Sequence, residues 1–167
     1  EPPDVEASEP NEIQPEPSDL TLQFPEGPVT LLAYEDEMDL AAIFGLPLVD
    51  ETIVLENADT FTGSFRKTLV YPETTLTLFS PKDDGERFYV YSLESSDERL
   101  TTQRGLRVGD SLEALRQAYP EMTRSLDGTT GDDGRYEVWL PDTAYTTLFF
   151  FVEDGQIQRI QLLHEFP

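Results

Sequence analysis

The sequence predicts an α+β fold of two tandem units, each a helix followed by a three-stranded antiparallel meander. The units share one sheet layer, and their helices pack on one face of it. Three observations support this prediction. Two segments carry apolar residues at helical spacing, each is followed by a run rich in β-branched and aromatic residues, and the two runs contain the same turn residues in the same order. Pro72 corresponds to Pro141, and Asp84-Gly85 corresponds to Asp154-Gly155.

The first helix is expected within residues 32–47, where Asp36 is placed to cap the first turn and Gly45 and Pro47 end the helix. Its apolar face consists of Met38, Leu40, Ile43 and Phe44. The first meander follows at residues 67–93, and an apolar run near residues 53–61 predicts an additional short strand before it.

The second helix is expected within residues 105–120, where either Asp110 or Ser111 caps it and Pro120 stops it. Its apolar face consists of Leu112, Leu115, Ala118 and Tyr119. The second meander occupies residues 136–163, and the Asp154-Gly155 pair predicts a tight hairpin between its last two strands.

Composition divides the chain further. Seven of the 13 prolines lie in the first 28 residues, which hold few large apolar side chains. Such a segment buries too little surface to offset the entropy of ordering. We therefore expect a disordered acidic, proline-rich tether at residues 1–19, a first α+β unit at residues 20–94 and a second at residues 95–167.

The charge of the chain restricts its ligands. The net charge is −23, and no Lys or Arg occurs before Arg66. Such a surface repels phosphate backbones, so nucleic acid is excluded as a ligand. The simplest interpretation of the acidity is that it keeps the protein soluble. The alternative is that the acidic groups bind a cationic partner or calcium. There are no cysteines and no run of 18 apolar residues, so neither disulfides nor a membrane-spanning segment is expected.

No catalytic constellation is recognisable. His164 is the single histidine, and it lies on an alternating strand without a nucleophile-elbow motif elsewhere. Paired carboxylates are uninformative among 34 acidic residues. The Asp-Asp-Gly segments at residues 83–85 and 132–134 lack the remaining ligands of a calcium loop. We expect no catalytic residue, metal site or cofactor.

Aromatic side chains provide the candidate binding site. In the predicted strands, alternation places one set of aromatic residues on the sheet face opposite the helices. The simpler alternative is that these strands are buried on both faces. A binding face would present these rings to a protein partner. The candidate residues are Tyr89, Tyr91, Trp139, Phe149 and Phe151.

The segment GLRVGDSLEALRQAYP resembles a motif of small bacterial exported proteins, through Gly109-Asp110-Ser111, Leu112 and Leu115. With the later meander, it resembles the beta-lactamase inhibitor protein family and the small outer-membrane assembly lipoproteins of the SmpA/OmlA type. The resemblance implies a tandem repeat of a helical segment and an antiparallel sheet, with a sheet surface that binds a partner protein. The inhibitor family carries disulfides, whereas this chain has no cysteine.

Together these features lead us to expect a non-enzymatic binding module of the cell envelope, in a bacterial exported lipoprotein. We expect it outside the cytoplasm, with a lipid anchor upstream of residue 1 and an unidentified protein partner. The alternative is a carboxylate-based hydrolase that acts on a cell-wall or carbohydrate substrate.

Overall fold

The computed structural model describes residues 17–125, 131–140 and 145–165. Its strands are β1 (Thr21–Phe24), β2 (Gly27–Thr30), β3 (Val49–Val54), β4 (Phe65–Tyr71), β5 (Thr74–Ser80), β6 (Tyr89–Ser95), β7 (Thr123–Arg124), β8 (Gly134–Trp139), β9 (Thr146–Glu153) and β10 (Gln156–His164). Its helices are α1 (Leu40–Phe44) and α2 (Leu112–Ala118), with short 3-10 turns η1 (Pro17–Leu20), η2 (Glu35–Glu37) and η3 (Asp59–Phe61).

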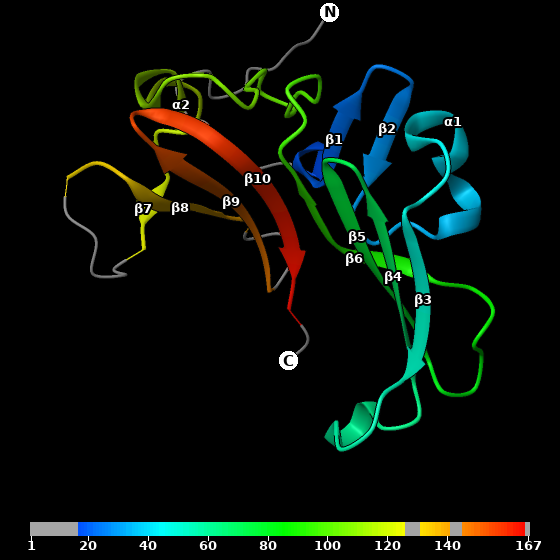
Figure 1. Ribbon diagram of the computed structural model, residues 1–167. Coiled ribbons are helices and arrows are strands. Elements are labelled where there is room, and N and C mark those ends of the chain that lie inside the picture. The colour runs from blue at the N-terminus through cyan, green and yellow to red at the C-terminus, as the bar shows by residue number, and fades with distance from the viewer. Residues whose placement is uncertain (1–16, 126–130, 141–144, 166–167) are drawn as a thin grey trace, which may run out of the picture.

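Eight strands form one antiparallel sheet in the order β3-β4-β5-β6-β10-β9-β8-β7, and β1 and β2 form a separate hairpin. In Figure 1 the β1–β2 hairpin and α1 lie beside the β3–β6 half of the sheet, and α2 lies beside the other half. No helix in the described ranges has the length and apolar character needed to cross a membrane.

The predicted α+β class is wrong. The described chain is mainly β, and only one of its helices reaches seven residues, so it is not built from helix-plus-strand units. The segment expected to form the first helix is interrupted at Met38, whose backbone is extended. Asp39 then begins a new helix by accepting a hydrogen bond from the Ala42 N–H, and Gly45 ends it at a φ of 78°. The resulting α1 is too short to cover the sheet alone, and the β1–β2 hairpin packs there instead.

The two meanders meet at the centre of the sheet. β4, β5 and β6 follow one another, as do β8, β9 and β10, and β6 pairs with β10. At this junction Leu93 faces Leu162 and Ser95 faces Ile160. Asp154 and Gly155 form a two-residue turn with φ values of 56° and 76°, which confirms the predicted tight hairpin between β9 and β10. Pro141 lies outside the described residues.

The core lies between one face of the large sheet and the layer of hairpin and helices. Alternate residues of the central strands are buried on this face, and they form one core with Leu115 of α2 and with Tyr119, which follows the helix. Ser111 is the N-cap of α2, because its Oγ accepts a hydrogen bond from the Ala114 N–H at 3.1 Å. Asp110, the other predicted cap, instead accepts a hydrogen bond from the Arg107 N–H.

The predicted tether lies outside the described residues up to residue 16. Its last residues belong to η1, where Asp19 is buried and its carboxylate lies 3.5 Å from the guanidinium of Arg104. Arg104 also forms an ion pair with Glu121 at 2.8 Å, so these contacts connect η1 to the segments on either side of α2.

Candidate binding face

The face of β8, β9 and β10 that points away from the core carries an ordered array of side chains. We call it the open face. Its residues are Arg135, Glu137, Trp139, Thr147, Phe149, Phe151, Arg159, Gln161 and Leu163. The strand register places Arg135, Phe151 and Arg159 in one row across the three strands, and Glu137, Phe149 and Gln161 in the next.

Arginines cover the two phenylalanines of the open face. The Arg135 guanidinium lies 4.7 Å from the centre of the Phe149 ring, and that of Arg159 lies 4.0 Å from the centre of the Phe151 ring. Phe149 is consequently only 5% exposed, and Phe151 is half-buried. These stacks keep the rings partly shielded from water while the charged edges of the guanidinium groups stay accessible.

Carboxylates hold both arginines in place. Arg159 Nε lies 2.6 Å from the Glu94 carboxylate of β6, and Arg135 lies 3.4 Å from the Glu137 carboxylate. Glu137 also accepts a hydrogen bond from the Ser125 hydroxyl. The rings are thus covered by side chains that are themselves fixed by ion pairs, which makes this part of the face preformed.

The other end of the open face is uncovered. Trp139 is 64% exposed and Tyr145 is 56% exposed, and no large aromatic side chain of the described chain is more exposed than these two. Both line a hollow of about 440 Å³ together with Glu137, Leu163 and Glu165. Aromatic walls, one aliphatic side chain and a carboxylate rim suit the burial of an apolar side chain beside a basic group.

The predicted site residues on β6 have different surroundings. The Tyr89 ring packs between Phe79 at 5.7 Å and Tyr34 at 6.0 Å. Tyr91 is half-buried and interacts with Arg66. Burial raises the pKa of both tyrosines, so both are neutral hydroxyl groups at physiological pH.

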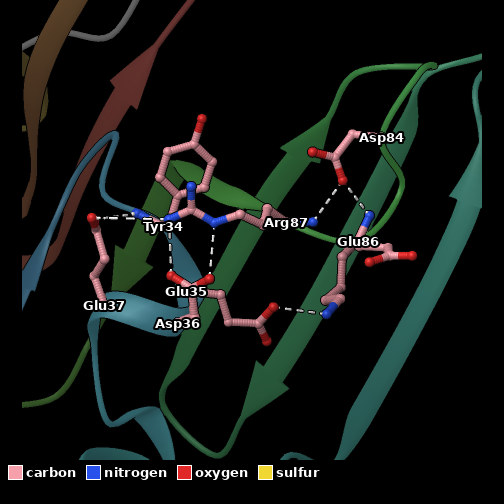
Figure 2. Close-up of polar contacts among 8 residues, drawn as sticks. Tyr34, Glu35, Asp36, Glu37, Asp84, Glu86 and Arg87 are labelled. Atoms are coloured by element: carbon pink, nitrogen blue, oxygen red, sulfur yellow. Dashed lines mark hydrogen bonds and ion pairs between the residues drawn. The ribbon is translucent and has the colours of Figure 1, made fainter.

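A polar cluster attaches the η2 segment to the sheet beside Tyr89. Figure 2 shows Arg87 between Tyr34 and Asp36: its guanidinium lies 3.7 Å from the centre of the Tyr34 ring, and Nε donates to Asp36 at 2.9 Å. The hydrogen bond from Arg87 holds the pKa of Asp36 below its ordinary value. Asp84 accepts hydrogen bonds from the backbone N–H groups of Arg87 and Glu86, which lowers its pKa as well. We interpret this cluster as a structural anchor.

His164 and the second Asp-Asp-Gly segment each contact a neighbouring strand or turn. The His164 Nδ1 lies 2.9 Å from the Thr146 hydroxyl on β9, and burial lowers the pKa of the imidazole. Asp133 accepts a hydrogen bond from the Asp154 N–H, which joins two turns. Within the described ranges, no three His, Asp or Glu side chains are grouped in a way that could hold a metal ion.

The structure therefore distributes the five predicted residues over two places: Trp139, Phe149 and Phe151 on the open face, and Tyr89 and Tyr91 on β6. Arg135, Arg159 and Tyr145 also belong to the candidate site, and they were not predicted from the sequence. Alternation along the strands does place both arginines on the face of Trp139 and Phe151. Tyr145 gives no comparable signal, because it is a turn residue directly before β9 and adopts a φ of 69°.

Comparison with known proteins adds no relative. No family model matches the chain, and no curated protein or solved structure matches it.

Proposed function

We propose that this protein is a non-enzymatic binding module of a bacterial cell envelope, and that it holds a protein partner on the open face. The observation that carries the proposal is the pair of exposed aromatic side chains, Trp139 and Tyr145, at the mouth of a hollow of about 440 Å³. Tryptophan and tyrosine bury a large area at small cost in side-chain entropy, and they dominate the energetics of many interfaces.

The charges around the hollow define the partner. Glu137 and Glu165 line it, and the one arginine there, Arg135, already interacts with Glu137. The complementary surface therefore presents an apolar side chain surrounded by lysine or arginine. The net charge of −23 favours encounter with such a basic surface and disfavours acidic ones.

Placement in the envelope, on a lipid-anchored exported chain, is part of the same proposal. It rests on the acidic, proline-rich composition of residues 1–19, which suits a spacer. The hydrolase alternative has less support. A general acid needs a raised carboxyl pKa, and the described carboxyl groups whose pKa departs from its ordinary value, Asp36, Asp84 and Asp97, are all lowered, first by hydrogen bonds.

The first experiment identifies the partner by photo-crosslinking. A photoreactive residue replaces Tyr145 in one sample and Lys82, on the β5–β6 loop, in a control sample. Both are incubated with envelope extract. The proposal expects a protein that is crosslinked from position 145 and not from position 82.

The second experiment measures the affinity of that purified protein. Trp139→Ala should weaken binding about 30-fold or more, as expected when a buried aromatic anchor is removed. Lys82→Ala removes an exposed side chain on the β5–β6 loop and should leave the dissociation constant unchanged. Equal dissociation constants for wild type and Trp139→Ala would contradict the proposal.

A further inference from the structure

A second surface of the molecule is unusually apolar. Six large apolar side chains are exposed in the described part of the chain, and four of them lie within residues 46–54. Leu46 is 87% exposed, Leu48 69%, Val54 50% and Val49 44%. Exposed apolar side chains that occur singly need no explanation. Leu46, Leu48 and Val49 instead lie within four residues at the start of β3, with Val54 at its other end, and such a grouping suits an interaction surface.

These residues surround a free strand edge. Among the described strands, β3 is the first in the sheet order and is hydrogen-bonded to β4 alone; Figure 1 shows it as the outermost strand on the side of α1. Its six residues pair with β4 in one uninterrupted register. In an antiparallel strand, alternate residues direct their N–H and C=O groups to opposite sides. Half of the residues of β3 therefore direct these groups away from the sheet.

Of the usual protections against strand addition, the edge has only two acidic side chains. Proteins commonly blunt an edge with lysine, with proline, with a bulge or with a very short strand. β3 contains neither lysine nor proline, and its register shows no bulge. Its charges are Asp50 and Glu51. At the opposite edge of the sheet, β7 has only two residues.

A hollow of about 330 Å³ adjoins the beginning of β3. Leu40, Leu46 and Met38 supply its apolar lining, and three carboxylates supply its polar lining. These carboxylates belong to Glu35, which already forms an ion pair with Lys67 at 2.8 Å, and to Asp39 and Asp50; no lysine or arginine lines the hollow. The pKa of Tyr71, at the same place, is raised first by burial and then by the negative charges of Glu35 and Asp50. The aliphatic stem of a lysine or arginine fits the apolar lining while its charge meets the carboxylates.

We propose that the free edge of β3 binds an extended, basic segment of a partner protein by strand addition. In this complex the backbone of the segment pairs with β3, its apolar side chains cover Val49 and Val54, and a lysine or arginine occupies the hollow beside Leu46. This surface lies at the opposite edge of the sheet from Trp139, so the proposal does not depend on the function of the open face.

The negative charge at the edge of β3 favours a basic segment over two other possible occupants. A second copy of the chain would bring another net charge of −23 to the edge and place Asp50 and Glu51 near their own equivalents. The chain's own residues 1–16 hold six acidic and no basic side chains, so they are repelled as well. A basic segment is attracted by the same groups.

The test uses synthetic peptides. The probe is a fluorescein-labelled ten-residue peptide of alternating lysine and valine. One control peptide has glutamate in place of lysine, and another has N-methyl groups on alternate residues, which removes half of its backbone donors. Fluorescence anisotropy with the full chain should show binding of the basic peptide, at least tenfold weaker binding of the methylated one, and no binding of the acidic one. Hydrogen exchange should slow at the outward amides of β3.

A matched pair of variants tests the edge itself. Leu55 donates its N–H to Ser64 on the β4 side, so alternation directs the N–H of Thr52 outward. Thr52→Pro removes that donor without removing a bond to β4, and it should weaken peptide binding at least tenfold. Thr52→Ala should bind as wild type does.

Three results would overturn the proposal. The first is unchanged binding of the methylated peptide, which does not depend on the folding of any variant. The second is equal binding of the basic and acidic peptides. The third is a dimer in analytical ultracentrifugation that Thr52→Pro abolishes, since it would make a second copy the occupant. If Trp139→Ala weakened binding of the protein partner of the open face, the result would concern the proposed function of that face and not the edge of β3.

Discussion

Tyr119 shows how a single side chain is fixed in the core. It follows the last residue of α2, is fully buried, and packs its ring 5.2 Å from that of Phe150 on β9. The Arg104 guanidinium lies 4.3 Å from the centre of the Tyr119 ring. Among the described residues the hydroxyl oxygen has no partner at full hydrogen-bond geometry, although Thr102 and the Arg104 backbone lie close enough to oppose the effect of burial on its pKa. Burial raises the pKa of Tyr119 to about 12 from 10.0, because ionisation would place a charge in the core.

This pKa predicts a loss of stability at alkaline pH. Because the folded-state pKa lies above that of the unfolded chain, the contribution is complete below pH 10 and is lost as the pH rises toward 12. The expected loss is on the order of 2–3 kcal/mol in the free energy of unfolding. Urea titrations at several pH values measure it. Tyr119→Phe should flatten the decline while changing stability little near pH 7; an equally steep decline in this variant would contradict the prediction.

The open face illustrates what can be predicted for individual residues. Alternation along β9 separates Phe149 and Phe151 from Leu148, Phe150 and Val152, and the latter three are indeed in the core. Alternation does not reveal whether a ring on the other face is covered. The guanidinium groups over Phe149 and Phe151 come from β8 and β10, and their positions depend on the strand register, which depends on contacts between distant residues.

At the scale of elements, α2 depends on its cap. The helix has only seven residues, so its end groups make up much of its hydrogen bonding. Ser111→Ala removes the acceptor for the Ala114 N–H and should cost about 1 kcal/mol in the free energy of unfolding. Ser111→Thr keeps a hydroxyl at the cap and should retain most of the stability. Thermal unfolding of the two variants compares them, and equal destabilisation would mean that the hydroxyl is not the stabilising group.

The helices also show why the fold class was predicted wrongly. The spacing of Leu40, Ile43 and Phe44 predicted a helix correctly at these residues, but not how far the helix extends. Asp36 and Asp39 both have capping side chains, and only tertiary contacts distinguish them: Asp36 is held by Arg87, from a segment 51 residues away. The β1–β2 hairpin was missed because its strands have four residues each and contain Pro28.

At the scale of the whole molecule, the sheet joins its two halves through β6 and β10. Four residue pairs connect these strands, from Ser92 with Leu163 to Ser95 with Ile160. The buried core beneath them is continuous and includes residues of β4 and β5 as well as of β8 and β9. A division into units at residues 20–94 and 95–167 would place the boundary within this core, so the two parts should depend on each other for stability.

This dependence predicts a single unfolding transition. Trp139, the single tryptophan, reports on β8, and the double variant Trp139→Phe, Tyr89→Trp moves the fluorophore to β6. In urea, each tryptophan should report one transition. Leu162→Ala creates a cavity at the junction and should lower the free energy of unfolding by about 2–5 kcal/mol as seen by either tryptophan. If the cavity shifted the transition of Trp139 while the tryptophan at position 89 reported an unchanged midpoint, the halves would be independent domains. Equal shifts would instead mean that a partner bound at either edge of the sheet stabilises the whole sheet, because anything that binds only the native state raises the stability of the entire cooperative unit.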